Sequence, residues 1–133
     1  MAKNFSFTKE QRLKSRKLID LVFSKGRRFN CGPFRVSFAL EGKEGQLQFG
    51  ITAGTRHFKK AVERNRIKRL ARECWRLQSG PLKTFMSQQS KPLAVFAVYT
   101  GKELPGYDLV SANMGKIIDN LLRLLNEKST SNP

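Results

Sequence analysis

Cationic side chains are concentrated between residues 61 and 73 of this chain, in the sequence AVERNRIKRLARE. With about 100° per residue, a helix over 61–78 would collect its apolar side chains on one face, namely Ile67, Leu70, Ala71, Cys74 and Leu77. The opposite arc would carry Arg64, Asn65, Lys68, Arg69, Arg72 and Arg76, with Arg66 at the border. Positions four residues apart stack about 6 Å apart along such a helix, close to the spacing of phosphates in an RNA strand. Arginine adds planar, bidentate phosphate contacts, so this pattern predicts a helix that docks on a core and binds a phosphate backbone.

The competing interpretation is a solvated helix face that serves solubility alone. Such a face usually intersperses acidic side chains among the basic ones, and here only Glu63 and Glu73 do so. The whole chain is also basic, with 26 Lys and Arg against 10 Asp and Glu and a formal net charge of +16. Because that charge repels itself, a polyanionic partner is expected: nucleic acid, an anionic membrane or an acidic protein.

A membrane is the least favoured of these partners. No apolar run approaches the roughly 20 residues that span a bilayer. The first residues, MAKNFS, lack the apolar region of a signal peptide. The expected compartment is therefore the cytoplasm, with no membrane partner.

Residues for catalysis are sparse. The acidic residues are scattered, and Glu63 and Glu73 would stand about 15 Å apart along their helix, too far for a two-metal site. His57 is the only histidine, and the two cysteines, Cys31 and Cys74, form neither a disulfide framework nor a zinc motif. We therefore predict a binding protein with no catalytic residue, no metal site and no small-molecule cofactor.

The elements that would position the basic helix follow from periodicity and capping. A first helix is expected from about Lys9, capped by Thr8, to Ser24, with Gly26 at its end. Strands are expected at 34–40, 46–53 and 93–99, the first two as a hairpin and the third buried and central. A short helical piece at 82–87 and a last helix capped by Ser111 complete the chain. The order α-β-β-α-β-α predicts an α/β sandwich with one small sheet, a single domain over 1–133 with its core at about 9–126 and flexible termini at 1–8 and 127–133.

The basic stretch resembles the signature of a known family. Arg64-Asn65-Arg66-Ile67-Lys68-Arg69-Leu70-Ala71-Arg72-Glu73, preceded by Ala61-Val62, is similar to the signature of the bacterial ribonuclease P protein component. Residues 12–26 look like that family's first helix, and the two strands follow at suitable spacing. The resemblance covers roughly residues 9–126.

The resemblance implies a ribosomal-protein-like α+β fold whose βαβ crossover is left-handed, against the general rule. It implies the protein subunit of an endoribonuclease that removes the 5′ leader of precursor tRNA, with catalysis by an RNA subunit. Mg²⁺ would be held mainly by that RNA and the substrate, and the partners would be the catalytic RNA and precursor tRNA. The implied RNA-binding residues are Arg64, Asn65, Arg66, Lys68, Arg69 and Arg72. A leader cleft between the first helix and the sheet would be lined by Ile19, Phe23, Phe34 and Ser37, with Lys68 and Arg72 at its edge.

Three positions depart from the family pattern. The loop over 55–60 is one residue longer than usual, Ile19 stands where an aromatic residue is common, and Ser37 stands where a tyrosine occurs. A ribosomal or other structural RNA-binding protein fits the composition equally well. A helix-turn-helix DNA-binding protein fits less well, because a strand and a loop precede the basic helix. A self-sufficient nuclease lacks the necessary acids.

Overall fold

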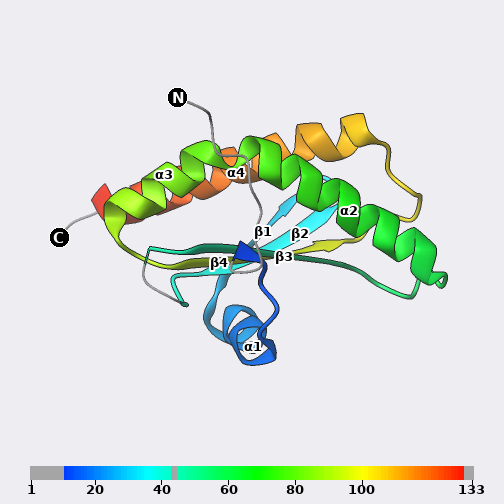
Figure 1. Cartoon of the computed structure of the whole chain (residues 1–133), viewed down its shortest axis with the longest axis horizontal. Helices are drawn as coiled ribbons and strands as arrows, with labels where there is room; N and C mark the ends of the chain where they lie inside the picture. Colours follow the sequence, from blue (N-terminus) through cyan, green and yellow to red (C-terminus); the bar gives the residue numbers. More distant parts are fainter. Residues whose placement is uncertain (1–10, 43–44, 131–133) are drawn as a thin grey trace.

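The computed structural model describes residues 11–42 and 45–130, with side chains described up to residue 126. It contains four helices and one four-stranded sheet within these residues (Figure 1). In chain order the elements are α1 (Arg16–Lys25), β1 (Arg27–Cys31), β2 (Phe34–Ala39), β3 (Leu47–Ala53), α2 (Ala61–Gln78), α3 (Gly80–Gln89), β4 (Leu93–Tyr99) and α4 (Tyr107–Thr130). The expected N-terminal arm, the Thr8 cap and residues 131–133 lie outside the described residues.

The strand order in the sheet is β1-β2-β4-β3, so the predicted hairpin between β2 and β3 is wrong. β4 lies between these two strands, antiparallel to β2 and parallel to β3. Its predicted central position is confirmed, because a nearly all-apolar strand needs a neighbour on each side. The parallel pair β3 and β4 is joined through α2 and α3, and the left hand of this crossover stays a prediction.

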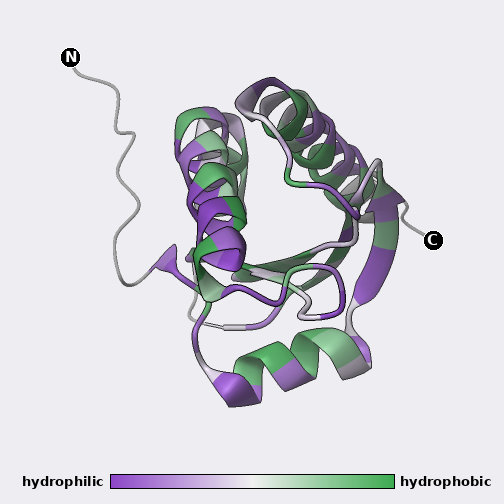
Figure 2. Ribbon diagram, turned by 90° about the vertical axis from the view of Figure 1, so that its right-hand side faces the viewer, coloured by the Kyte–Doolittle hydropathy of each residue, from purple (hydrophilic) through white to green (hydrophobic). Residues whose placement is uncertain are grey.

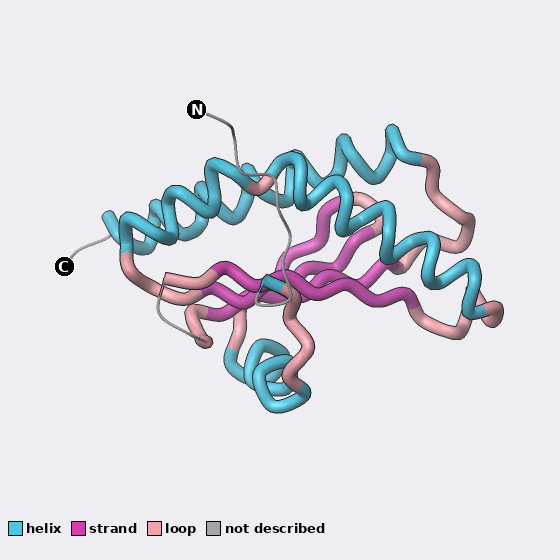
Figure 3. Tube along the Cα trace, in the orientation of Figure 1, coloured by secondary structure: helices cyan, strands magenta, loops and turns pink. Residues whose placement is uncertain are grey.

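Helices cover both faces of the sheet (Figures 2 and 3). The sheet separates two cores of unequal size. Alternate residues of β2 such as Phe34, Val36 and Phe38 point toward α2, α3 and α4, where the main core lies. The residues between them face α1, where a small core contains Leu13, Val22 and Ala94. The α/β sandwich is thus confirmed, with three helices on one side and α1 alone on the other.

Helix α1 begins at Arg16, seven residues later than the predicted start at Lys9. Ser15 is its N-cap, and the Ser15 hydroxyl accepts a hydrogen bond from the backbone N–H of Leu18 at 3.2 Å. The preceding residues are extended, because Leu13 donates its N–H to the carbonyl of Phe49 in β3 at 2.9 Å. Pairing with the sheet therefore replaces the first predicted turns of helix.

Two further elements differ from the sequence prediction. Strand β1 was not predicted, because its sequence RRFNC is polar and lies at a sheet edge where only Cys31 is buried. Helix α4 begins at Tyr107, so Ser111 lies within the helix instead of capping it. The Ser111 hydroxyl and carbonyl instead accept hydrogen bonds from the Gln78 amide, at 3.1 and 3.0 Å, which ties α2 to α4. Among the described residues, no helix is long and apolar enough to cross a membrane.

Candidate nucleic-acid interface

The basic helix α2 is held on the sheet by an aromatic stack. The ring of Trp75 lies parallel to that of Phe49 in β3, with centroids 4.2 Å apart and an interplanar angle of 10°. The buried residues of α2 are Ile67, Ala71, Cys74 and Trp75. Leu77, which was predicted to be on the buried face, is 38% exposed. The buried face is thus rotated toward Trp75 and β3 relative to the prediction.

This rotation divides the predicted RNA-binding residues of α2 into two groups. Asn65, Arg66 and Arg69 are exposed, and we call them the outer face. Arg64, Lys68 and Arg72 are half-buried and follow one another at intervals of four residues along the flank of α2, and we call them the edge line. The predicted RNA-binding residues therefore share a helix but not a single surface.

Arg64 acts on the protein itself. Its Nη1 donates hydrogen bonds to the carbonyl oxygens of Phe58 at 2.7 Å and Lys59 at 2.9 Å. Phe58 is buried in the main core. The loop before α2 is therefore fixed both by the packing of the Phe58 ring and by the hydrogen bonds of the Arg64 guanidinium. The loop residues Arg56, His57, Lys59 and Lys60 are exposed. Arg64 thereby positions further cations beside the N-terminus of α2.

Arg64 and Arg66 should consequently behave differently when truncated. We expect Arg64→Ala to lower the free energy of unfolding by about 1.5–3 kcal/mol, because two charge-assisted hydrogen bonds are lost. Arg66→Ala should change stability by less than about 0.5 kcal/mol and flatten the salt dependence of RNA binding by about one unit of slope. Urea denaturation and binding titrations in NaCl measure the two effects. An unchanged urea midpoint in Arg64→Ala would contradict this role.

A second candidate surface lies on the other side of the sheet, beside α1. Phe23, in the last turns of α1, is 40% exposed. Its ring meets the ring of Phe96 in β4 edge to face, with centroids 5.4 Å apart. Gly50 is paired with Phe96 across the strands, and a Cβ atom at Gly50 would lie 2.7 Å from the Phe96 ring. The missing side chain at Gly50 therefore lets the Phe96 ring approach β3 closely.

The predicted leader residues are only partly brought together. Ile19 and Ser37 face this side of the sheet with Phe23, but Ile19 packs into the small core and Ser37 is 1% exposed. Phe34 was predicted to line the cleft, and this is wrong. Its side chain points to the opposite side of the sheet, is 1% exposed and packs edge to face on Tyr99. Since β2 alternates, Phe34 and Ser37 cannot share a surface.

Other residues beside Phe23 were not predicted. The register places Arg35 opposite Val98, and Val98 opposite Thr52, on the α1 side of the sheet. Arg35 is exposed, and Val98, Thr52 and Phe96 are half-buried. We call Phe23, Phe96, Val98, Thr52 and Arg35 the α1-side surface. Two of these residues, Arg35 and Phe96, could have been found from alternation along their strands once the pairing of β2 with β4 was known.

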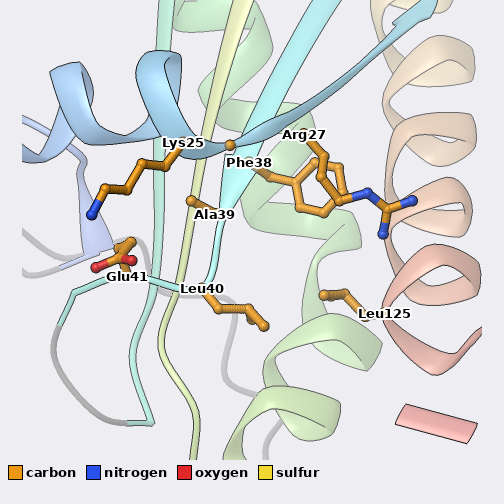
Figure 4. A pocket seen from close by; sticks show the side chains of 8 residues that line it. Lys25, Arg27, Phe38, Ala39, Leu40, Glu41 and Leu125 are labelled. Atoms are coloured by element: carbon orange, nitrogen blue, oxygen red, sulfur yellow. The ribbon is translucent and has the colours of Figure 1, made fainter. Parts of the chain in front are cut away.

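A pocket of about 190 Å³ lies elsewhere, at the end of the sheet between α1 and α4 (Figure 4). Phe38, Leu40 and Leu125 provide apolar lining. Its charged side chains are Lys25, Arg27 and Glu41, and the guanidinium of Arg27 lies 5.7 Å from the centroid of the Phe38 ring. Because a carboxylate shares this pocket and a cation already covers the aromatic ring, it suits a polyanion less well than the surfaces above.

The nucleophilic side chains are not arranged for reaction. Burial raises the pKa of both the Cys31 and the Cys74 thiols, which keeps them protonated. His57 is exposed in the loop before α2. Within residues 11–42 and 45–126, no group of three or more His, Cys, Asp or Glu side chains could hold a metal ion. The groups that gather on the two candidate surfaces are cations and aromatic rings.

Comparisons with known proteins agree with this arrangement. The chain matches the Ribonuclease P family over residues 7–121. It is 31% identical over 115 residues to the ribonuclease P protein component of Porphyromonas gingivalis strain W83, which covers 84% of this chain and 83% of that protein. It is 42% identical over 81 residues to the corresponding protein of Desulfatibacillum aliphaticivorans, covering 60% and 66%. The structure of the Staphylococcus aureus RNase P protein is similar with a TM-score of 0.52 and 20% identity, covering 88% of this chain and 96% of that one, and this similarity shows the fold.

Proposed function

The chain belongs to the ribonuclease P protein family, the protein part of a ribonucleoprotein endoribonuclease of tRNA 5′ processing, and on that premise we propose that it binds both a catalytic RNA and the 5′ leader of precursor tRNA. The family match carries this proposal, because it spans the basic helix and both candidate surfaces. The cytoplasm, where precursor tRNA is found in bacteria, is the proposed compartment.

The two surfaces suit two different kinds of RNA contact. The outer face of α2 presents Asn65, Arg66 and Arg69, beside which the described part of the chain places no aromatic ring, and this suits the phosphate backbone of a folded RNA. The α1-side surface presents Phe23 beside Phe96 and the exposed Arg35, which suits unpaired bases that stack on a ring. We therefore assign the catalytic RNA to the outer face and the single-stranded leader to the α1-side surface.

Under this proposal the RNA subunit carries out the hydrolysis and the protein improves binding. Mg²⁺ would be bound mainly by RNA phosphates of the catalytic RNA and the substrate. The +16 charge of the protein would reduce the repulsion between these two polyanions. The need for Mg²⁺ should fall accordingly when the protein is present.

The test is cleavage of precursor tRNA at low, near-physiological Mg²⁺, with protein alone, bacterial ribonuclease P RNA alone, and both together. We expect the mixture to cleave at least about tenfold faster than the RNA alone, equal to about 1.4 kcal/mol of transition-state stabilisation. Protein alone should not cleave.

The double variant Arg66→Ala with Arg69→Ala tests the outer face. It should fold normally but enhance cleavage much less than the unchanged protein. If the mixture is no faster than the RNA alone while RNA binding is intact, the protein is a structural RNA-binding protein and this proposal fails.

A further inference from the structure

The segment before α1 lies along the outer edge of β3. Arg12 pairs in parallel with Phe49, and the N–H of Leu13 donates to the Phe49 carbonyl at 2.9 Å. Leu13 is buried in the small core with Val22 and Ala94. Because side chains alternate in an extended segment, Arg12 points to the other side of the sheet, toward α2.

Helix α2 brings Arg72 to the same edge. Trp75, one turn after Arg72, stacks on Phe49, the residue with which Arg12 pairs. Arg12 and Arg72 interact electrostatically. Partial burial, together with the positive charge of Arg12, lowers the pKa of Arg72. Two guanidinium groups from distant parts of the chain therefore lie close enough for their charges to repel.

We propose that Arg12 and Arg72 jointly bind one phosphate group of an RNA strand at the edge of β3. The proposal rests on the proposed function for the identity of the RNA, and it adds Arg12 to the binding residues. A phosphate has enough oxygen atoms to accept hydrogen bonds from both planar guanidinium groups. Its negative charge between them would attract each guanidinium group and so offset the repulsion between the two.

The place of this pair gives it a specific task. The outer face and edge line of α2 lie on one side of the sheet, and Phe23 and Phe96 lie on the other. The segment containing Arg12 and Leu13 runs along the β3 edge between these sides, with the Leu13 side chain in the small core and the Arg12 side chain toward α2. Lys68, one turn before Arg72 on the edge line, continues the positive charge along the helix. An RNA strand that passes from the α1-side surface around the β3 edge toward α2 would meet the Arg12 and Arg72 pair at that edge.

The test uses Arg12→Gln, Arg72→Gln and the double variant in the full chain. Affinity would be measured against NaCl concentration for two probes, the catalytic RNA and a single-stranded oligouridylate. We expect each single variant to lose about tenfold in affinity for both probes and about one unit of salt slope. Since both arginines would hold the same phosphate, the double variant should lose little more affinity than either single variant and still only about one unit of slope.

Lys116→Gln is the matched control, because Lys116 is an exposed cation of α4 near Cys31, at the opposite edge of the sheet. It should leave both probes unaffected. Losses that multiply in the double variant, with two units of slope lost, would overturn the shared site. An Arg12→Gln variant that binds like the unchanged protein would overturn it as well.

A third measurement does not depend on the identity of the RNA. Inorganic pyrophosphate should raise the melting temperature of the unchanged protein and of Lys116→Gln above that in NaCl of equal ionic strength, since a ligand that binds only the folded state stabilises it. The rise in melting temperature should be absent in Arg12→Gln and smaller in Arg12→Lys. If the catalytic RNA does not bind but the oligouridylate and pyrophosphate effects hold, the proposed function fails and the phosphate site stands; an equal rise in all variants would overturn the site.

Discussion

Replacing Phe23 with alanine should weaken the binding of precursor tRNA to the holoenzyme by about one to two orders of magnitude, the effect of removing one base-stacking ring. Mature tRNA, which lacks the leader, should bind as before. The expectation follows from a ring that is 40% exposed on the α1-side surface and braced edge to face by Phe96 at 5.4 Å. The measurement is the dissociation constant of each tRNA with the assembled ribonucleoprotein.

Tyr107→Ala is the matched control for Phe23→Ala. Tyr107 is 42% exposed, on the first turn of α4, on the opposite side of the sheet from α1. Removing its ring should affect neither tRNA. Equal losses of precursor and mature tRNA in Phe23→Ala would refute the assignment of the leader to this surface, and loss of folding would show that the Phe23 ring serves the small core.

Trp75→Ala should have the largest effect on stability, lowering the free energy of unfolding by about 3–5 kcal/mol. The indole is fully buried and stacked on Phe49, so its removal leaves a cavity where α2 meets the sheet. Domains of this size have a total stability of about 5–15 kcal/mol, so the variant should melt at a much lower temperature. RNA binding should fall with the folded fraction, because the cations of α2 are positioned by this contact.

Two variants show whether the stack is responsible. Trp75→Phe keeps an aromatic ring against Phe49 and should lose less stability than Trp75→Ala. Leu77→Ala, two residues further along α2, should change the free energy of unfolding by less than about 1 kcal/mol, because this side chain is 38% exposed. A larger loss in Leu77→Ala than in Trp75→Ala would mean that α2 is rotated as its sequence alone had predicted.

Local patterns predicted the elements that carry their own signal. The bounds of α2 and of β4 agree with the sequence prediction, because an amphipathic repeat and an unbroken apolar run are properties of the segments themselves. The pairing of β2 with β3 was predicted from their closeness in the chain, and it failed because a distant strand, β4, inserts between them. A buried central strand needs two neighbours, so the prediction for β4 already contradicted the hairpin.

The candidate site was predictable as a list of residue types, but not as surfaces. A helical repeat cannot show that Arg64 donates to two carbonyl groups of its own loop, since this depends on the path of residues 54–60. Phe34 and Ser37 were grouped together although they lie three positions apart on one strand. Period-two alternation places two such residues on opposite faces of the sheet. Arg12 was placed in a helix, and only its pairing with Phe49 reveals it as a neighbour of α2.

The sheet between the outer face of α2 and the α1-side surface has a consequence for how the protein can evolve. These two surfaces share no side chain, and the main core and the strands lie between them. Under the proposed assignment, substitutions around Phe23 and Phe96 would change leader preference from one lineage to another without altering the surface proposed for the catalytic RNA. The first surface could then vary with the precursor tRNAs of the host, while the second would be constrained to coevolve with the RNA subunit.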